Sequence, residues 1–325
     1  MTVIDVHTHM LNNEWVKRLA KEGERYTVEE RGGQQVVHLD GAPFMTLMDN
    51  MFDYAKRIEN MDKAGVDIAI VSLTCPSVYW GGEETSRHTA RMMNDDMAAQ
   101  QRAWPDRIRY FATLPWQYPQ TALGELAHAC DHGALGVFVS ANIDGISLTD
   151  EKFAPLWEEI DRRGLPVLVH PTAPPGTAEM DVFDYNLIAS TGFMFDTTLA
   201  VSRMIFDGFL DRYPSLKIIA GHGGGFLPYQ AGRLDMCYRN MPPCREKISR
   251  PPSTYLSQIY YDSVVFTQGA LDLCVDVGGG DNVLFGSDYP HNIGDMSGCL
   301  GRVDSLPAAE RKKVRGENAK RIFSL

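Results

Sequence analysis

The sequence predicts a (β/α)8 barrel with a small insertion after its first strand. Short β-rich segments alternate with amphipathic helical segments along the chain. Eight such β segments occur in 325 residues, a length that suits one barrel. Four of them, in "MTVIDVHTHM", "LPVLVHPTAP", "LKIIAGHGGG" and "NVLFGSDYPHN", end in histidine or aspartate. Such endings are expected where the carboxyl ends of barrel strands form an active site.

The predicted strands are short and rich in β-branched and aromatic residues. They are Val3–His7, Ile68–Ser72, Ile108–Thr113, Gly136–Ser140, Pro166–His170, Lys217–Ala220, Ile259–Tyr261 and Asn282–Phe285. Helical patterns such as "DYAKRIENMDKAG" and "DEKFAPLWEEIDRRG" fill the gaps and close on glycine. An open doubly wound sheet is the alternative fold. No G-x-G-x-x-G follows the first strand, which removes the usual dinucleotide-binding version of it.

Residues 11–52 interrupt this alternation. The stretch "ERYTVEERGGQQVVHLDG" is typical of a hairpin that turns at Gly32 and Gly33. We interpret residues 11–52 as an insertion, a flap near the barrel mouth, within a single barrel domain that spans residues 1–325. A second long connection, "TAPPGTAEMDVFDYN", follows the fifth strand. Loops of this length in a compact domain are often functional.

Composition and charge narrow the range of partners. The net charge of −11 and the pI of about 5.3 argue against a general affinity for nucleic acid or anionic membrane. No apolar run reaches the ~18 residues of a membrane helix, and no signal peptide is recognisable. The six cysteines show no C-x-x-C spacing, which favours reduced thiols. We therefore expect a cytoplasmic protein.

The histidines and the aspartate at the strand ends indicate a metal site. Side chains alternate along a strand, so His7 and His9 share one face. His170 and Asp288, from the fifth and eighth strands, complete a nitrogen-rich donor set for one divalent ion. Zn²⁺ suits this set, and Mn²⁺ is the alternative. The fourth strand, in "LGVFVSANIDG", offers no lysine that could be carbamylated to bridge two metals, and we expect no organic cofactor.

His222 stands apart because three glycines follow it in "GHGGG". Glycine lets a backbone approach a ligand closely. As a fourth histidine, His222 would either ligate the metal or act as a general acid or base on a metal-bound water. We favour the acid–base role.

Several blocks of the sequence resemble one known family. They are "DVHTHM", "RIENMDKAGVDIAIVS", "RGLPVLVHP", "FDGFLDRYPSLKIIAGHGGGFLPYQAGRLD", "RPPSTYLSQIYYDSVVF" and "NVLFGSDYPH". Their order and spacing are similar to those of the amidohydrolase superfamily. Within it, the chain resembles the branch of metal-dependent decarboxylases typified by 2-amino-3-carboxymuconate 6-semialdehyde decarboxylase. The resemblance covers nearly the whole chain.

This resemblance implies roles for particular residues. Asp288 joins His222 as a catalytic group, in addition to its place among the metal ligands. Arg57 matches an arginine that binds the substrate carboxylate. Arg233 matches a second such arginine that reaches in from a neighbouring subunit, which implies a homodimer or a higher oligomer. Tyr185 and His291 are expected to face the substrate. The metal ligands implied by the family are His7, His9, His170 and Asp288.

We therefore predict a metal-dependent, non-oxidative decarboxylase of an unsaturated or aromatic carboxylic acid. The alternative enzyme is a hydrolase of a lactone, ester or amide, or a hydratase of an unsaturated acid. A non-catalytic barrel with a structural metal is the third possibility. Arg57 and Arg233 favour the decarboxylase, because a substrate without carboxylates would leave both arginines without a function.

Overall fold

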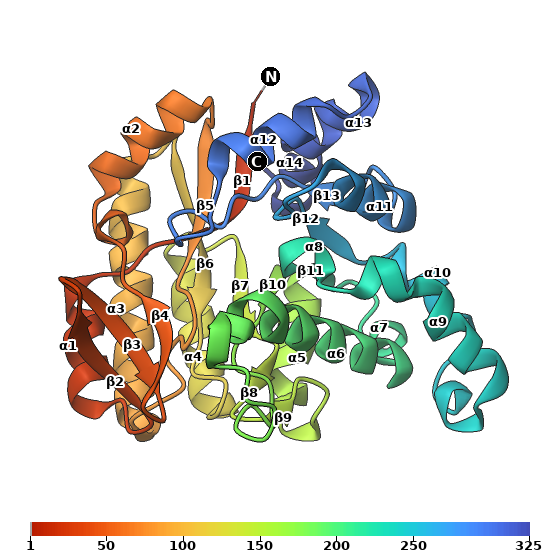
Figure 1. Ribbon diagram of the computed structural model, residues 1–325, viewed down its shortest axis with the longest axis horizontal. Helices are drawn as coiled ribbons and strands as arrows, with labels where there is room; N and C mark the ends of the chain where they lie inside the picture. Colours follow the sequence, from red (N-terminus) through yellow and green to blue (C-terminus); the bar gives the residue numbers. More distant parts are fainter. Residues whose placement is uncertain (1) are drawn as a thin grey trace.

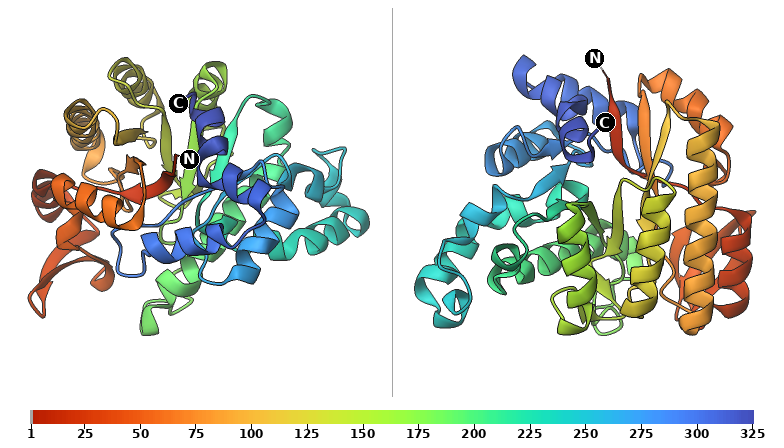
Figure 2. Two further views of the ribbon diagram at one scale, coloured as in Figure 1. Left: turned by 90° about the horizontal axis from the view of Figure 1, so that it is seen from above. Right: turned by 180° about the vertical axis from the view of Figure 1, so that it is seen from behind.

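The computed structural model describes residues 2–325 and confirms the predicted (β/α)8 barrel (Figure 1). Eight parallel strands form one sheet in the order β1-β5-β6-β7-β10-β11-β12-β13. Helices surround the strands, as the two further views show (Figure 2). The strands are β1 Ile4–His9, β5 Ile68–Ser72, β6 Ile108–Thr113, β7 Gly136–Ser140, β10 Pro166–His170, β11 Lys217–Ala220, β12 Tyr260–Asp262 and β13 Val283–Leu284.

The barrel closes between β1 and the segment that follows β13. The amide of Val6 donates to the carbonyl of Phe285 at 2.9 Å, and the amide of His9 donates to Tyr289 at 2.8 Å. β1 extends to His9, two residues past its predicted end, because these bonds and the pairing with β5 continue that far. The closure brings the carboxyl end of β1 beside the residues that follow β13.

The helices that cover the barrel begin and end where the sequence supplies caps. In α2, Tyr54–Ala64, the side chain of Asp53 accepts from the amide of Lys56, and Gly65 ends the helix at φ 78°. The other long helices are α3 Gly82–Ala103, α4 Pro119–Asp131, α5 Ala154–Arg163, α6 Phe193–Phe206, α9 Leu227–Asn240, α11 Gln268–Gly278 and α12 Met296–Asp304. Short helices are α7 Phe209–Arg212, α8 Gly221–Gly224, α10 Pro252–Leu256, α13 Ala308–Lys312 and α14 Asn318–Phe323.

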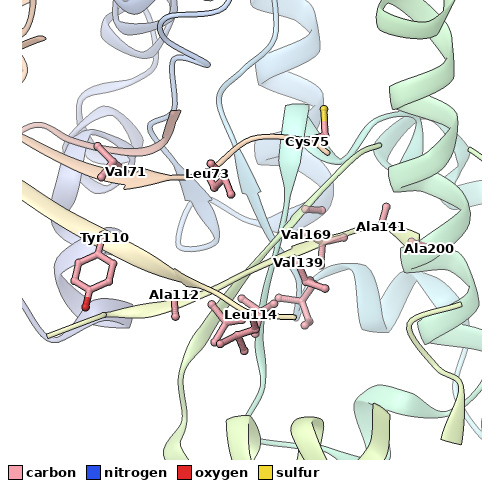
Figure 3. Close-up of a cluster of buried hydrophobic side chains, with 14 of the residues drawn as sticks. Val71, Leu73, Cys75, Tyr110, Ala112, Leu114, Val139, Ala141, Val169 and Ala200 are labelled. Atoms are coloured by element: carbon pink, nitrogen blue, oxygen red, sulfur yellow. The ribbon is translucent and has the colours of Figure 1, made fainter. Parts of the chain in front are cut away.

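Alternation along the strands divides the apolar side chains between two clusters. Val71, Ala112, Val139 and Val169 face outward toward the helices (Figure 3). A second cluster includes Ile4, Val6, Ile70, Phe111, Phe138, Leu168, Ile219 and Leu284, with Ala319, Ile322 and Phe323 from α14. The final helix thus contributes apolar side chains to the barrel interior.

Residues 11–52 form more structure than the predicted hairpin. They contain the helix α1, Asn13–Glu22, and a three-stranded antiparallel sheet. The sheet comprises β2 Tyr26–Arg31, β3 Gln34–Leu39 and β4 Ala42–Thr46 and lies to one side of the barrel (Figure 1). Gly32 and Gly33 form the β2–β3 turn with φ of 58° and 81°, as the sequence suggested. The third strand was not anticipated.

A further small hairpin pairs β8, Asn142–Ile143, with β9, Ile146–Ser147. None of the helices formed by residues 2–325 is both long enough and apolar enough to cross a membrane.

Replacing Phe323 by alanine should lower the free energy of unfolding by about 3 kcal/mol, because the ring is buried beside Phe111 at a centroid distance of 5.5 Å. Urea denaturation would measure the loss. The control is Leu325→Ala, where the side chain is 37% exposed and the expected change is within about 0.5 kcal/mol. Equal effects of both variants would show that α14 does not stabilise the barrel interior.

Candidate metal centre and active site

The predicted ligands meet at the carboxyl ends of the strands. The ring centroids of His7 and His9 lie 5.1 Å apart, and His170 lies 5.1 Å from His7 and 4.9 Å from His9. His7, His170, His222 and Asp288 each offer one ligand atom, and these atoms lie within 4.8 Å of one another. Barrel closure therefore gathers residues that are up to 281 positions apart, as the Thr8–Tyr289 contact illustrates.

The buried nitrogens of this cluster fit a cation. Nε2 of His7, Nε2 of His170 and Nδ1 of His222 are buried and have no hydrogen-bond partner. The Nδ1 of His170 lies 2.8 Å from the carbonyl of Pro171, which can only accept, so Nδ1 carries the proton and Nε2 carries a lone pair. Unpaired buried nitrogens cost free energy. A divalent metal ion would satisfy Nε2 of His7 and Nε2 of His170, and the donor set of imidazoles and one carboxylate suits zinc or manganese.

Asp288 connects the histidines. Its Oδ1 lies 3.1 Å from Nε2 of His9 and 3.5 Å from Nε2 of His7, and its Oδ2 lies 3.7 Å from Nε2 of His222. Burial alone would raise the pKa of Asp288, but the electrostatic interaction with His291 and the hydrogen bonds from His222 and His9 hold this pKa well below its usual value. The carboxylate is thus ionised and able to bind a cation.

Two histidines of the cluster, His9 and His170, remain neutral in this environment. Burial is the main cause that lowers the pKa of His9 to about 3; the hydrogen bond to Asp288 opposes it, and His291 and His7 act in the same direction as burial. Burial, followed by the influence of His9 and His7, also lowers the pKa of His170 well below its ordinary value. A neutral imidazole is the form that binds a metal ion.

Asp262 organises one side of the cluster. Its Oδ2 accepts a hydrogen bond from Nδ1 of His7 at 2.5 Å and from the amide of His222 at 2.9 Å. Its Oδ1 accepts from the amides of Gly223 and Val264. Burial favours a higher pKa for Asp262, but the interaction with His7 outweighs it and lowers that pKa. The proton on Nδ1 leaves Nε2 of His7 free to bind metal, the carboxylate–histidine arrangement common in metal sites.

In the sequence, Asp262 directly follows the seventh predicted strand, a position that suits either a ligand-orienting group or a loop cap. The structure extends β12 to Asp262, and the side chain both bonds His7 and caps the loop after β11.

The glycines after His222 let the chain fold tightly around the carboxylate of Asp262. His222 and Gly223 have φ of 56° and 60°, and a Cβ at Gly223 would lie 2.5 Å from a methyl carbon of Val265. Their amides bind Asp262 and do not face a ligand. The imidazole of His222 is 8% exposed and lines the cavity above the cluster.

His291 lies next to the cluster on its other side. Its ring centroid is 5.0 Å from that of His9, and its Nε2 is 3.0 Å from Oγ1 of Thr74. His9, Asp288 and His291 form a second group of atoms close enough to share a cation. The structure therefore places His291 on the cavity wall, where a substrate could contact it.

A cavity of about 930 Å³ opens above the cluster. Its wall includes His170, His222, Asp288 and His291 on the barrel side. Residues of the insertion also line the cavity, and among them the Phe44 ring packs edge-on against Phe193 of α6 at a centroid distance of 5.9 Å. Other apolar residues on the wall include Val36, Met45, Met194, Val264, Val265, Phe266 and Ile293. The volume lies near the upper end of the range for small-molecule sites.

Arg57 lies outside this wall and is fully buried. Its guanidinium donates to Oγ1 of Thr8 and to the carbonyl of His9, both at 2.5 Å, and lies 4.7 Å from the ring centre of Tyr289. Its Nε approaches the sulfur of Met10 at 2.9 Å. The structure thus shows Arg57 supporting the end of β1, while its contact with a substrate carboxylate stays a prediction.

Arg233 and Tyr185 are both exposed and do not line the cavity of this chain. Arg233 lies on α9. Tyr185 is 93% exposed and has φ of 55°, whereas its neighbour Asn186 does line the cavity. Their roles in binding substrate, and the contribution of Arg233 to a second subunit, stay predictions.

Comparison with known proteins agrees with the motifs and the geometry. Residues 4–325 match the family described as Amidohydrolase. The chain belongs to the amidohydrolase family. The 2-amino-3-carboxymuconate-6-semialdehyde decarboxylase of Dictyostelium discoideum is 30% identical to this amidohydrolase over 331 residues, which are 99% of this chain and 91% of the relative. The gamma-resorcylate decarboxylase of a Polaromonas species is also 30% identical and covers 93% of this chain and 98% of its own.

Solved structures share the whole fold. The 5-carboxyvanillate decarboxylase from Sphingomonas paucimobilis has a TM-score of 0.88 at 26% identity, with coverage of 100% of this amidohydrolase and 99% of that chain. A dihydroxybenzoic acid decarboxylase from a Polaromonas species has a TM-score of 0.82 at 25% identity. The match covers 100% of this amidohydrolase and 97% of that chain. That structure contains manganese and the inhibitor 2-nitroresorcinol. The relatives match the decarboxylase branch that the sequence motifs indicated.

Asp262→Asn should weaken metal binding about 10- to 100-fold, because its amide group would face N–H donors and could not hold His7 in the same way. Metal content after dialysis against a chelator series would measure this. The matched control is Asp272→Asn, on the exposed side of α11, which should retain wild-type affinity. Unchanged metal affinity in Asp262→Asn would show that His7 does not depend on this carboxylate.

Arg57→Lys should lower the free energy of unfolding by about 2 kcal/mol, because one ammonium group cannot replace the contacts of the guanidinium with Thr8 and His9. Urea denaturation would test this, with Lys56→Gln on the exposed face of α2 as the control. A stable variant that binds carboxylic acids more weakly would instead assign Arg57 to the substrate.

Proposed function

We propose that this amidohydrolase is a metal-dependent, non-oxidative decarboxylase of an unsaturated or aromatic carboxylic acid. The observation that carries the proposal is the His–Asp cluster beneath a large apolar cavity. Named decarboxylases that match over more than 90% of this chain support the same chemistry. The apolar wall suits a planar unsaturated or aromatic skeleton.

In this reaction the bond between the carboxylate and the adjacent carbon breaks. Carbon dioxide leaves, the electron pair stays on the carbon, and a proton takes the place of the carboxylate. No oxidant or organic cofactor is needed. His7, His9, His170 and Asp288 would hold one divalent ion, with Zn²⁺ as the first candidate and Mn²⁺ as the alternative. When bound, that ion supplies positive charge that polarises an oxygen of the substrate.

His222 and Asp288 would move the proton. Nε2 of His222 lies 3.7 Å from Oδ2 of Asp288, and both side chains line the cavity. His222 would carry the proton to the carbon, and Asp288 would orient its imidazole. His291, on the same wall, would contact the substrate. The buried position of these groups limits the access of water to the reacting carbon.

The same proposal includes a homodimer in the cytoplasm. Its support is the exposed surface of α9, where Tyr229 is 84% and Met236 is 53% exposed beside Arg233. Contact at this surface would cover these apolar side chains and bring Arg233 toward the cavity of a second subunit. Tyr185, exposed on the loop before α6, would order against the substrate.

The experiment is a screen for carbon dioxide release by the purified enzyme at known metal content. Substituted benzoic acids and unsaturated carboxylic acids would be tested beside lactones, esters and amides. We expect carbon dioxide from one or more acids and no hydrolysis. Release of ring-opened or hydrated products without carbon dioxide would contradict the proposal and favour the hydrolase or hydratase alternative.

His222→Asn should reduce kcat at least 100-fold on the acid that is identified, because it removes the proton donor. Substrate affinity and metal content should stay within about twofold of wild type if the side chain moves only the proton. The matched control is His88→Asn on the exposed face of α3. Loss of metal from His222→Asn would make His222 a ligand and not the acid.

A further inference from the structure

The cavity has a single lysine or arginine on its wall among residues 2–325, and that residue is Arg31. It is the last residue of β2, next to the turn at Gly32 and Gly33. The acidic side chains on the wall are Asp288 and Asp295. Without Arg31, the residues of this chain would give the part of the cavity away from the metal centre no fixed positive charge to attract an anion.

The register of the insertion places Arg31 on the face that looks into the cavity. Arg31 pairs with Gln34, and Val36 pairs with both Glu29 on β2 and Thr46 on β4. Paired residues share one face, and so do residues two apart on a strand. Arg31, Val36 and Thr46 therefore lie on one face, and all three line the cavity.

The Arg31 guanidinium has no carboxylate partner within residues 2–325. The other arginine of this sheet region, Arg25, bonds to Asp40. Glu29, two residues from Arg31 on the same face of β2, lies 3.7 Å from Nε2 of His38. Arg31 thus keeps its planar set of donors free, and a guanidinium binds a carboxylate through two parallel hydrogen bonds.

We propose that Arg31 binds a second acidic group of the substrate and selects acids that carry an anionic group remote from the carboxylate that is lost. The inference rests on the proposed function. The reacting carboxylate belongs at the metal cluster on the strand ends. Arg31 comes from the insertion, which lies to one side of the barrel strands (Figure 1). Apolar side chains such as Phe44 and Val36 line the same wall and suit the skeleton between the two acids.

Calorimetric titration of the metal-loaded enzyme would test this inference without turnover. The probes are diacids of increasing length: isophthalate, 4-(carboxymethyl)benzoate and biphenyl-3,3′-dicarboxylate. Each is paired with its monoamide, in which the second carboxylate is replaced by an uncharged group of similar shape. We expect at least one diacid to bind wild type tenfold or more tightly than its monoamide, because a charged hydrogen-bonded pair forms only with the diacid.

Arg31→Gln should weaken the binding of that diacid at least tenfold and change the affinity for its monoamide less than twofold. Arg31→Lys, which keeps the charge, should retain part of the preference. The matched control, Lys21→Gln, removes one positive charge from the same insertion at a side chain that is 80% exposed and outside the cavity wall, and it should behave as wild type.

Two results would overturn the inference: no diacid preferred over its monoamide by wild type, or equal weakening of diacid and monoamide in Arg31→Gln. The screen for carbon dioxide release tests the decarboxylase proposal separately. Selective diacid binding through Arg31 without carbon dioxide release from any acid would refute the decarboxylase proposal alone. Carbon dioxide release from monoacids with no diacid preference would refute the role of Arg31 alone.

Discussion

The contact between the end of β1 and the segment after β13 is the constraint on which the site depends. It fixes Asp288 beside His7 and His9, which lie at the other end of the chain. The amide of Asp288 also donates to the carbonyl of His7 at 2.8 Å, so backbone and side chain hold the same geometry. The imidazoles of His9, His222 and His291 then offset the cost of burying the ionised carboxylate of Asp288.

The backbone stores strain at the same positions. His222 and Asp288 both have positive φ, which is uncommon for residues with a Cβ. Such conformations persist only where the surroundings determine them. Asp262 fixes His222 by accepting a hydrogen bond from its amide. The carbonyl of His7 in β1 fixes Asp288 by accepting a hydrogen bond from the amide of Asp288. The two side chains proposed to move the proton are thus aimed by backbone bonds and not by flexible loops.

Much of this arrangement could be predicted from the sequence because it follows from strand geometry. The eight strands, the shared face of His7 and His9, and the meeting of His170, His222 and Asp288 all depend on periodicity and on strand ends meeting at one rim. Long-range contacts were harder to predict. The hydrogen bond from Arg57 to the carbonyl of His9 in β1 depends on how α2 packs. Whether Arg31 faces the cavity depends on the register of a sheet whose third strand, β4, had no clear signal in the sequence.

The net charge of −11 disfavours an anionic substrate only if charge is averaged over the surface. A buried or confined site responds to the charges that line it, because low-dielectric walls focus their field. Here a metal ion at the floor would provide positive charge for one carboxylate, and Arg31 at the insertion would provide it for a second. The excess of acidic groups elsewhere then repels non-specific anions, such as nucleic acid, without weakening the site. Affinity for a small acid therefore depends on where two positive charges lie and not on their number.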